Sequence, residues 1–184
     1  MSKSALKILN TAEELFNQYS FTSVGVDLIR DESGCSKTTM YTYFKNKQHL
    51  VAEVLKTRDQ RFQQSLIEYV GQHTGLSALD RIYDWHINWF QTDHFKGCLF
   101  VRAVAESSTE DTEILGVSKQ HKIWLRAFIH QALGKDDHSQ EIVELFYNVI
   151  EGLISRFLVE GFDQNIADLN KHILNTYQQA LKQS

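Results

Sequence analysis

The chain has 184 residues, enough to bury a core as one large domain or as a small domain joined to a medium one. Its net charge of −4 and ordinary composition are typical of a soluble protein, and the absence of proline beside long 3.6-residue hydrophobic patterns argues against β-sandwich and α/β folds. Two cysteines without paired spacing, no long apolar segment near the N-terminus and no apolar run of membrane-spanning length predict a reduced, cytoplasmic protein with neither signal peptide nor membrane span.

Two short amphipathic segments open the chain. The first predicted helix has an apolar face made by Ile8, Ala12, Leu15, Phe16 and Tyr19. A second helix follows Gly25 and ends near Ser33, with Val26 and Ile29 facing inward. Gly25 would let the backbone approach a phosphate group, and a simple loop glycine explains the residue equally well.

The stretch from Gly34 to Lys47 has the pattern of a helix that touches DNA. Gly34 suits the positive φ that ends one helix, and the Ser36 hydroxyl can cap the next. Met40 and Phe44, four residues apart, would form the buried edge of this short helix. Its other edges carry hydrogen-bond donors suited to phosphates, base edges and thymine methyl groups: Lys37, Thr38, Thr39, Tyr41, Thr42 and Tyr43.

The charge around this helix favours a polyanion, although the whole chain is acidic. No acidic residue occurs between Glu32 and Glu53, while Lys37, Lys45 and Lys47 all lie in that interval. Lys47 would stand in the first turn of the following helix, beside exposed backbone N–H groups that attract phosphate. A solvated lysine is the alternative interpretation.

A spaced pattern in the same region resembles a known family. Phe21, Val24-Gly25-Val26-Asp27-x-Ile29 and Ser33-Gly34-Cys35-Ser36-Lys37-x-Thr39-x-Tyr41-x-x-Phe44-x-x-Lys47-x-x-Leu50 together resemble the DNA-binding domain of TetR-type transcriptional regulators, over roughly residues 5 to 55. The resemblance implies a three-helix N-terminal domain with a helix-turn-helix, a larger helical ligand-binding domain, and a homodimer that usually represses until an inducer binds.

The resemblance also assigns roles to single residues. Positions that commonly contact operator DNA in the family are matched here by Lys37, Thr39, Tyr41, Tyr43 and Lys47. The chain departs from the family pattern at Thr38, which is often Gly, at Tyr43, which is often His, and at Cys35, which replaces a common Val. The first two departures imply that the operator sequence can differ from those of other family members. The third replaces one small apolar side chain with another and should leave the packing unchanged.

The remainder of the chain predicts further helices and a ligand pocket. Asn46 would cap a linker helix reaching residue 70, Ser108 or Thr109 would cap a helix ending at Gly134, and Asp137 to Gln140 resembles a capping box. Candidate effector-binding residues are Trp85, Trp89, Phe100, Arg102, Trp124, Phe128 and Phe146. Such aromatic residues belong to a core more often than to a pocket, and Arg102 could pair with either an anionic effector or Glu106.

The last two predicted helices indicate a dimer. The apolar stripe after residue 140 is wider than one core face needs, and a second amphipathic helix follows the cap Asp163. A homodimeric four-helix interface would use Phe146, Val149, Ile150, Leu153, Phe157, Ile166, Leu169, Ile173 and Tyr177. The alternative is that both helices serve only the core of one chain.

Signatures of catalysis and cofactor binding are missing from the sequence. The eight histidines are scattered without metal-ligand spacing, although His86 and His121 lie near aromatic clusters and could orient a ligand. There is no Gly-x-Ser-x-Gly elbow, activated cysteine, P-loop or GxGxxG segment. We therefore predict no catalytic residue, no metal site and no cofactor.

These observations predict an all-α homodimer with a DNA-binding domain over residues 1–46 and an effector-binding and dimerisation domain over residues 47–184. It would repress transcription by binding a palindromic double-stranded operator and would be released by a small-molecule effector. Two alternatives remain: a helical ligand-binding or scaffolding protein without DNA function, and a helical enzyme that uses the aromatic cavity.

Overall fold

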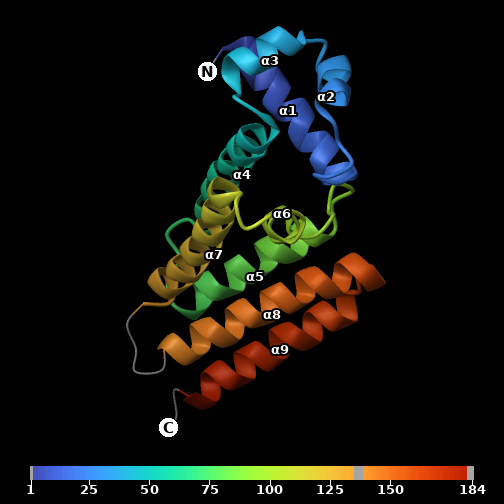
Figure 1. Cartoon of the computed structure of the whole chain (residues 1–184). Helices are drawn as coiled ribbons and strands as arrows, with labels where there is room; N and C mark the ends of the chain where they lie inside the picture. The colour runs from blue at the N-terminus through green and yellow to red at the C-terminus, as the bar shows by residue number, and fades with distance from the viewer. Residues whose placement is uncertain (1, 135–138, 182–184) are drawn as a thin grey trace. The chain divides into compact units, whose positions relative to one another are not determined.

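The computed structural model describes residues 2–134 and 139–181 and confirms the all-α prediction (Figure 1). The described residues form nine helices: α1 (Lys3–Gln18), α2 (Val26–Ser33), α3 (Lys37–Tyr43), α4 (Lys47–Val70), α5 (Leu76–Phe90), α6 (Leu99–Glu106), α7 (Thr112–Leu133), α8 (Ser139–Glu160) and α9 (Gln164–Leu181). They make two compact units. The first contains residues 1–62 and 98–121, and the second contains residues 63–97 and 122–184, so α4 and α7 contribute to both.

The first unit is built on α1, which packs against both α2 and α3 (Figure 1). Its core joins Ile8 and Phe16 of α1, Ile29 of α2, Met40 of α3 and Leu50 of α4. Apolar side chains of α6 and the start of α7 enter the same core: Leu99, Phe100, Ala103 and Ile114. This compact unit therefore extends beyond the boundary at residue 46 that we predicted for the DNA-binding domain.

The predicted turn chemistry around α3 is confirmed. Gly34 has a φ of +60°, in the left-handed region that favours glycine, and ends α2. The Ser36 hydroxyl accepts the backbone N–H of Thr39 at 3.0 Å, and the Asn46 side-chain oxygen accepts the N–H of His49 at 2.8 Å. These caps define both ends of the turn that presents α3.

Of two helix caps predicted further along the chain, one is wrong and the other cannot be compared with the structure. Helix α7 begins at Thr112, later than a Ser108 or Thr109 cap would allow. The backbone N–H and the hydroxyl of Ser108 both donate to the Asp111 carboxylate, so this segment forms a turn ahead of the helix. The predicted capping box begins at Asp137, which lies outside the described residues.

The second unit contains α5, α8 and α9, and α8 and α9 run side by side (Figure 1). The buried face of α8 includes Ile142, Phe146, Ile150, Leu153 and Phe157. Asp163 caps α9 as predicted: it precedes the helix, and its carboxylate accepts the N–H of Asn165 at 2.8 Å. Buried Tyr83 of α5 donates its hydroxyl to the Ala167 carbonyl of α9 at 2.7 Å, and burial raises the pKa of Tyr83 above its usual range.

Replacing Tyr83 with phenylalanine should lower the free energy of unfolding by about 1 kcal/mol, because the hydrogen bond to Ala167 is lost while the ring stays packed. Urea denaturation followed by circular dichroism would measure the change. Tyr41→Phe is the matched control, since the Tyr41 ring is exposed and this change should alter stability by less than about 0.5 kcal/mol. Equal stability of Tyr83→Phe and the wild type would contradict the role of this bond.

None of the described helices is long and apolar enough to cross a membrane.

Candidate nucleic-acid interface

Helix α3 presents most of its predicted contact residues to solvent. Thr38, Tyr41, Thr42 and Tyr43 are exposed, and Thr39 is partly buried. Met40 and the C-cap residue Phe44 face the core, as their spacing predicted. A helix of seven residues is too short to be stable alone, so these two core contacts and the Ser36 cap hold α3 in place.

The hydroxyl groups of α3 divide into two sets. The Thr39 hydroxyl lies 2.8 Å from that of Ser36, and the Thr42 hydroxyl donates to the Thr38 carbonyl at 2.9 Å. Tyr41 and Tyr43 are the large hydrophobic side chains exposed on this helix, and each carries a hydroxyl group at its tip. In the absence of DNA the hydroxyls of Thr39 and Thr42 therefore bond within this segment, while the two tyrosines offer planar rings and donors to a partner.

Lys37 already has an anionic partner on the surface. Its ammonium lies 3.1 Å from the Asp27 carboxylate of α2, which also accepts from Arg30 at 2.9 Å. Hydrogen bonding to Lys37 lowers the pKa of Asp27. Exposed ion pairs contribute little free energy, so a phosphate can replace Asp27 as the partner of Lys37. The sequence did not predict this pair, because the two residues lie ten positions apart on different helices.

Gly25 precedes α2 as its N-cap residue. Its φ of −84° lies in a region open to any residue, and a Cβ atom placed there would meet nothing within 4 Å. The backbone geometry therefore does not demand glycine at this position. The exposed first turn of α2 leaves backbone N–H groups available to an anion, and both earlier interpretations of Gly25 stay predictions.

Lys47 begins α4 and is partly buried rather than fully solvated. It lines a hollow of about 130 Å³ together with Phe21, Thr22 and Glu106. Burial lowers the pKa of Lys47, and the charge of Glu106 opposes that shift. The Glu106 carboxylate also accepts the N–H of Thr22 at 2.8 Å, so the end of α6 is bonded to the turn between α1 and α2.

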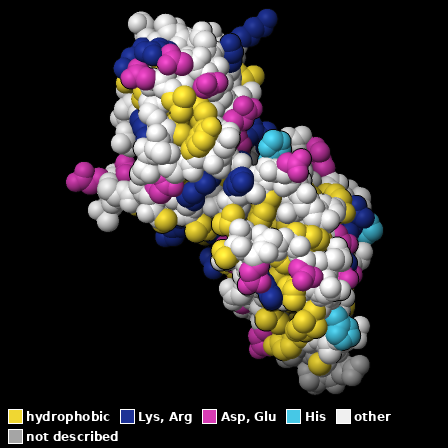
Figure 2. Space-filling model, turned by 90° about the vertical axis from the view of Figure 1, so that its right-hand side faces the viewer, with side chains coloured by type: hydrophobic (Ala, Val, Ile, Leu, Met, Phe, Trp, Pro, Cys, Tyr) yellow, Lys and Arg dark blue, Asp and Glu magenta, His cyan; other side chains and the backbone are white. Residues whose placement is uncertain are grey.

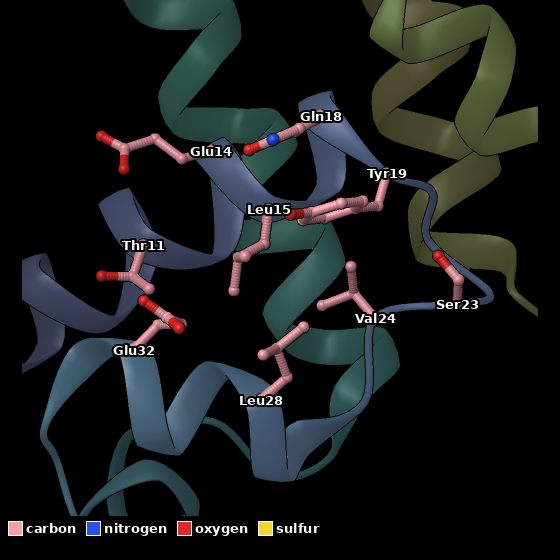
Figure 3. A pocket seen from close by; sticks show the side chains of 9 residues that line it. All are labelled: Thr11, Glu14, Leu15, Gln18, Tyr19, Ser23, Val24, Leu28 and Glu32. Carbon is pink, nitrogen blue, oxygen red and sulfur yellow. The ribbon is translucent and has the colours of Figure 1, made fainter.

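A larger hollow lies between α1 and α2 (Figure 3). Its volume is about 440 Å³, and the side chains of Leu15, Val24 and Leu28 point into it. Glu14 and Glu32 lie at its edge and carry negative charge, which disfavours a polyanion on this side of the unit. We therefore expect DNA to bind at the exposed face of α3 and not at this hollow.

The candidate effector residues fall into both compact units. Trp85 and Trp89 are neighbours on α5, with ring centroids 6.2 Å apart, and the Trp85 indole donates to the Ser65 hydroxyl at 3.0 Å. Trp124 and Phe128 stack on α7 with centroids 5.1 Å apart. Buried Phe146 packs edge-on against Tyr83, whereas Phe100 and Arg102 belong to the first unit. These seven residues line neither of the two hollows above.

Arg102 makes contacts that neither sequence interpretation anticipated. Its guanidinium donates to the backbone carbonyls of Phe16 and Asn17 at the C-terminal end of α1, both at 2.9 Å. Helix ends leave carbonyls without intrahelical partners, and a cation is favourable there. Arg102 therefore caps α1 from a distance of more than 80 residues along the chain. Burial lowers the pKa of this guanidinium.

His121 is likewise bound within the first unit. Its ring stacks on Phe100 with centroids 3.7 Å apart, and its Nδ1 lies 2.7 Å from the Asp59 carboxylate. Phe100 and His121 thus belong to a buried cluster that joins α6, α7 and α4.

The predicted dimer residues separate into buried and exposed sets. Phe146, Ile150, Leu153 and Phe157 are already buried within one chain, and Val149 and Ile166 are partly buried. Leu169, Ile173 and Tyr177 of α9 are 52%, 49% and 38% exposed, while Ala167, Leu174 and Gln178 form the buried face of that helix. Exposed hydrophobic side chains of this kind are visible on the surface in Figure 2.

Comparison with known proteins agrees with this helix-turn-helix. Residues 8–54 match the family model for bacterial regulatory proteins of the tetR family. The uncharacterized HTH-type transcriptional regulator YhgD of Bacillus subtilis (strain 168) is 26% identical, over 86% of this chain and 96% of its own length.

Solved structures share the fold over nearly the whole chain. A putative TetR transcriptional regulator from Streptomyces avermitilis has a TM-score of 0.82 at 20% identity, covering 97% of this chain and 98% of that one. A cysteine mutant of the TetR family regulator CifR, in a structure that includes 26-bp double-stranded operator DNA, has a TM-score of 0.77 at 14% identity, covering 98% of this chain and 97% of that one.

The fold and the exposed α3 define a helix-turn-helix DNA-binding transcriptional regulator. Residues 8–54 are a DNA-binding domain of the tetR family type.

Proposed function

We propose that this protein is a homodimeric repressor that binds a palindromic operator and is released by a small-molecule effector. The observation that carries the proposal is the exposed face of α3, which offers threonine and tyrosine side chains in a segment without acidic residues from position 33 to 52. The CifR relative has been solved with operator DNA, which supports the same partner for this chain. Acting on operator DNA would place the protein in the cytoplasm.

The proposed contacts assign positioning and sequence recognition to different residues. Lys37 and Lys47 would bind phosphates, assisted by the backbone near Gly25. Tyr41 and Tyr43, with Thr38, Thr39 and Thr42, would lie against base edges or sugars in the major groove. Two copies related by a two-fold axis would place two α3 helices in successive major grooves, roughly 34–36 Å apart.

The exposed apolar face of α9 supports the homodimer. Leu169, Ile173 and Tyr177 recur at intervals of four residues, which places them on one side of the helix, away from its buried face. An isologous four-helix interface with α8 of each copy would cover these side chains. Residues 1–46 would then hold the DNA contacts, and residues 47–184 would hold the dimer and effector functions.

The effector site is proposed among the aromatic residues of the second unit. Trp85, Trp89, Trp124 and Phe128 are partly buried, so each ring keeps some surface that a ligand could contact. Arg102 and Phe100 would affect effector binding only indirectly, because both already make contacts within the first unit. An effector would act by favouring one of two arrangements of the recognition helices.

Selection from random duplex DNA, followed by titration of the winning sequence at several salt concentrations, tests the proposal. We expect a palindrome bound at about 10⁻⁸ M or tighter, with affinity that falls steeply as salt rises. A folded, dimeric sample that enriches no sequence would contradict the proposal and would favour a helical ligand-binding protein without DNA function.

Two substitutions should then separate phosphate contacts from base contacts. Lys47→Ala should weaken binding to all sequences by a similar factor and reduce the salt dependence, because it removes one phosphate contact. Thr39→Ala should change the preferred bases instead. Lys119→Ala, at an exposed position of α7, is the control and should leave both properties unchanged. Unaltered binding in both test variants would contradict the contact assignment.

A further inference from the structure

We infer that His49, Glu53 and Glu113 form a binding site for one divalent transition-metal ion of the Zn²⁺ type. One ring nitrogen of His49 and one oxygen from each carboxylate lie within 4.8 Å of one another. His49 and Glu53 are four residues apart on α4, so they share one face of that helix, and Glu113 comes from the first turn of α7. All three belong to the first compact unit.

The spacing is close to that of a coordinated ion. Tetrahedral ligands bound at about 2.1 Å lie about 3.4 Å from one another, so the three atoms would need to approach by up to about 1.4 Å. The Glu113 side chain is 47% exposed and the Glu53 side chain is 27% exposed, so each has space in which its carboxylate can turn. We therefore expect rotation of the two carboxylates to close the site around an ion.

Lys56 shows that the two carboxylates already meet at a point that holds a cation. Its ammonium lies 2.7 Å from the Glu53 carboxylate and 2.6 Å from that of Glu113. A divalent ion carries twice the charge of the ammonium, and the flexible Lys56 side chain can withdraw into solvent when such an ion binds.

His49 supplies the nitrogen ligand that distinguishes this cluster from an ordinary surface ion pair. Its Nδ1 is buried and has no hydrogen-bond partner among the described residues. Most buried polar atoms have a hydrogen-bond partner, so a buried Nδ1 without one is unusual. Binding a metal ion would give this nitrogen a partner without breaking a hydrogen bond. The Phe44 ring lies beside this imidazole, with the two ring centroids 6.2 Å apart.

The donor set selects the class of ion. One imidazole nitrogen and two carboxylate oxygens suit Zn²⁺, Co²⁺ or Ni²⁺, whereas Mg²⁺ and Ca²⁺ prefer shells made of oxygen alone. Three protein ligands would leave one position of a tetrahedral ion for water. The sequence does not show this site, because Glu113 lies 60 positions after Glu53.

Titration of the metal-free full-length protein with Co²⁺, followed by visible absorption, tests the site directly. We expect one ion per chain, with ligand-field bands that disappear when Zn²⁺ displaces Co²⁺. Glu113→Gln should weaken Co²⁺ binding at least about tenfold while the fold is retained, because the side chain is exposed. Glu110→Gln, at an exposed position in the turn before α7, is the matched control and should bind like the wild type.

Two further variants separate a metal site from a purely structural ion pair. Lys56→Gln should bind Co²⁺ about tenfold more tightly, because it removes the competing cation from both carboxylates. His49→Ala should lose binding, and His73→Ala in the second unit should retain it. Absence of Co²⁺ binding in both the wild type and Lys56→Gln would overturn the proposal, as would unchanged binding in both His49→Ala and Glu113→Gln. None of these readouts depends on DNA.

Discussion

Replacing Arg102 with methionine is expected to lower the free energy of unfolding by about 2 kcal/mol. The substitution keeps an unbranched side chain of similar length but removes both donors to the Phe16 and Asn17 carbonyls. Those two carbonyls end α1 and would lose a charged partner in a partly buried setting, which costs more than the loss of an exposed ion pair.

Urea denaturation of the full-length protein would measure this loss. Arg126→Met is the matched control, since Arg126 lies over the Tyr147 ring at 5.4 Å and should contribute less than about 1 kcal/mol. An equal loss of unfolding free energy in the two variants would show that the bonds from Arg102 to α1 contribute no more than an ordinary surface contact. A loss confined to Arg102→Met would show that α6 stabilises the helix that supports the recognition helix.

Replacing Ile173 with glutamate is expected to convert the proposed dimer into monomers. Because the interface has two-fold symmetry, each dimer would bury two unpaired carboxylates, and each burial costs several kcal/mol. Analytical ultracentrifugation should give a mass near 21.3 kDa for the variant and about twice that for the wild type. Affinity for a palindromic operator should fall by about a hundredfold or more, since the two half-sites would no longer be bound together.

Gln179→Glu is the control for this experiment. Gln179 is exposed and lies roughly 120° around α9 from Ile173, away from the apolar face. This variant should stay dimeric with wild-type affinity. If Ile173→Glu were also dimeric, the exposed face of α9 would not be the interface, and another apolar surface of the second unit would have to supply it.

The sequence was most informative where the chemistry is local. Gly34, Ser36 and Asn46 each act within four residues of their own position, so the two caps and the left-handed turn around α3 could be predicted one residue at a time. The i, i+4 spacing of Met40 and Phe44 likewise identified the buried edge of α3. The face of α3 that remained was the candidate DNA surface.

Contacts between distant segments could not be predicted in the same way. Arg102 and Glu106 bond to α1 and to the turn after it across more than 80 residues, and no periodicity encodes that distance. Helix α9 shows a second limit. The apolar face predicted from its large side chains is exposed in the single chain. The face that is buried there consists of Ala167, Leu174 and Gln178. Hydrophobic periodicity marks an apolar face without identifying the surface that covers it.

The position of α6 affects how DNA specificity could be transplanted between regulators. Residues 98–121 share one compact unit with residues 1–62, and Arg102 and Glu106 bond directly to the N-terminal segment. A chimera joined after residue 46 would pair α1 of one parent with an α6 that evolved against another. A functional exchange therefore needs two discontinuous inserts, so that the recognition helix is transferred together with the distant residues that brace its supporting helix.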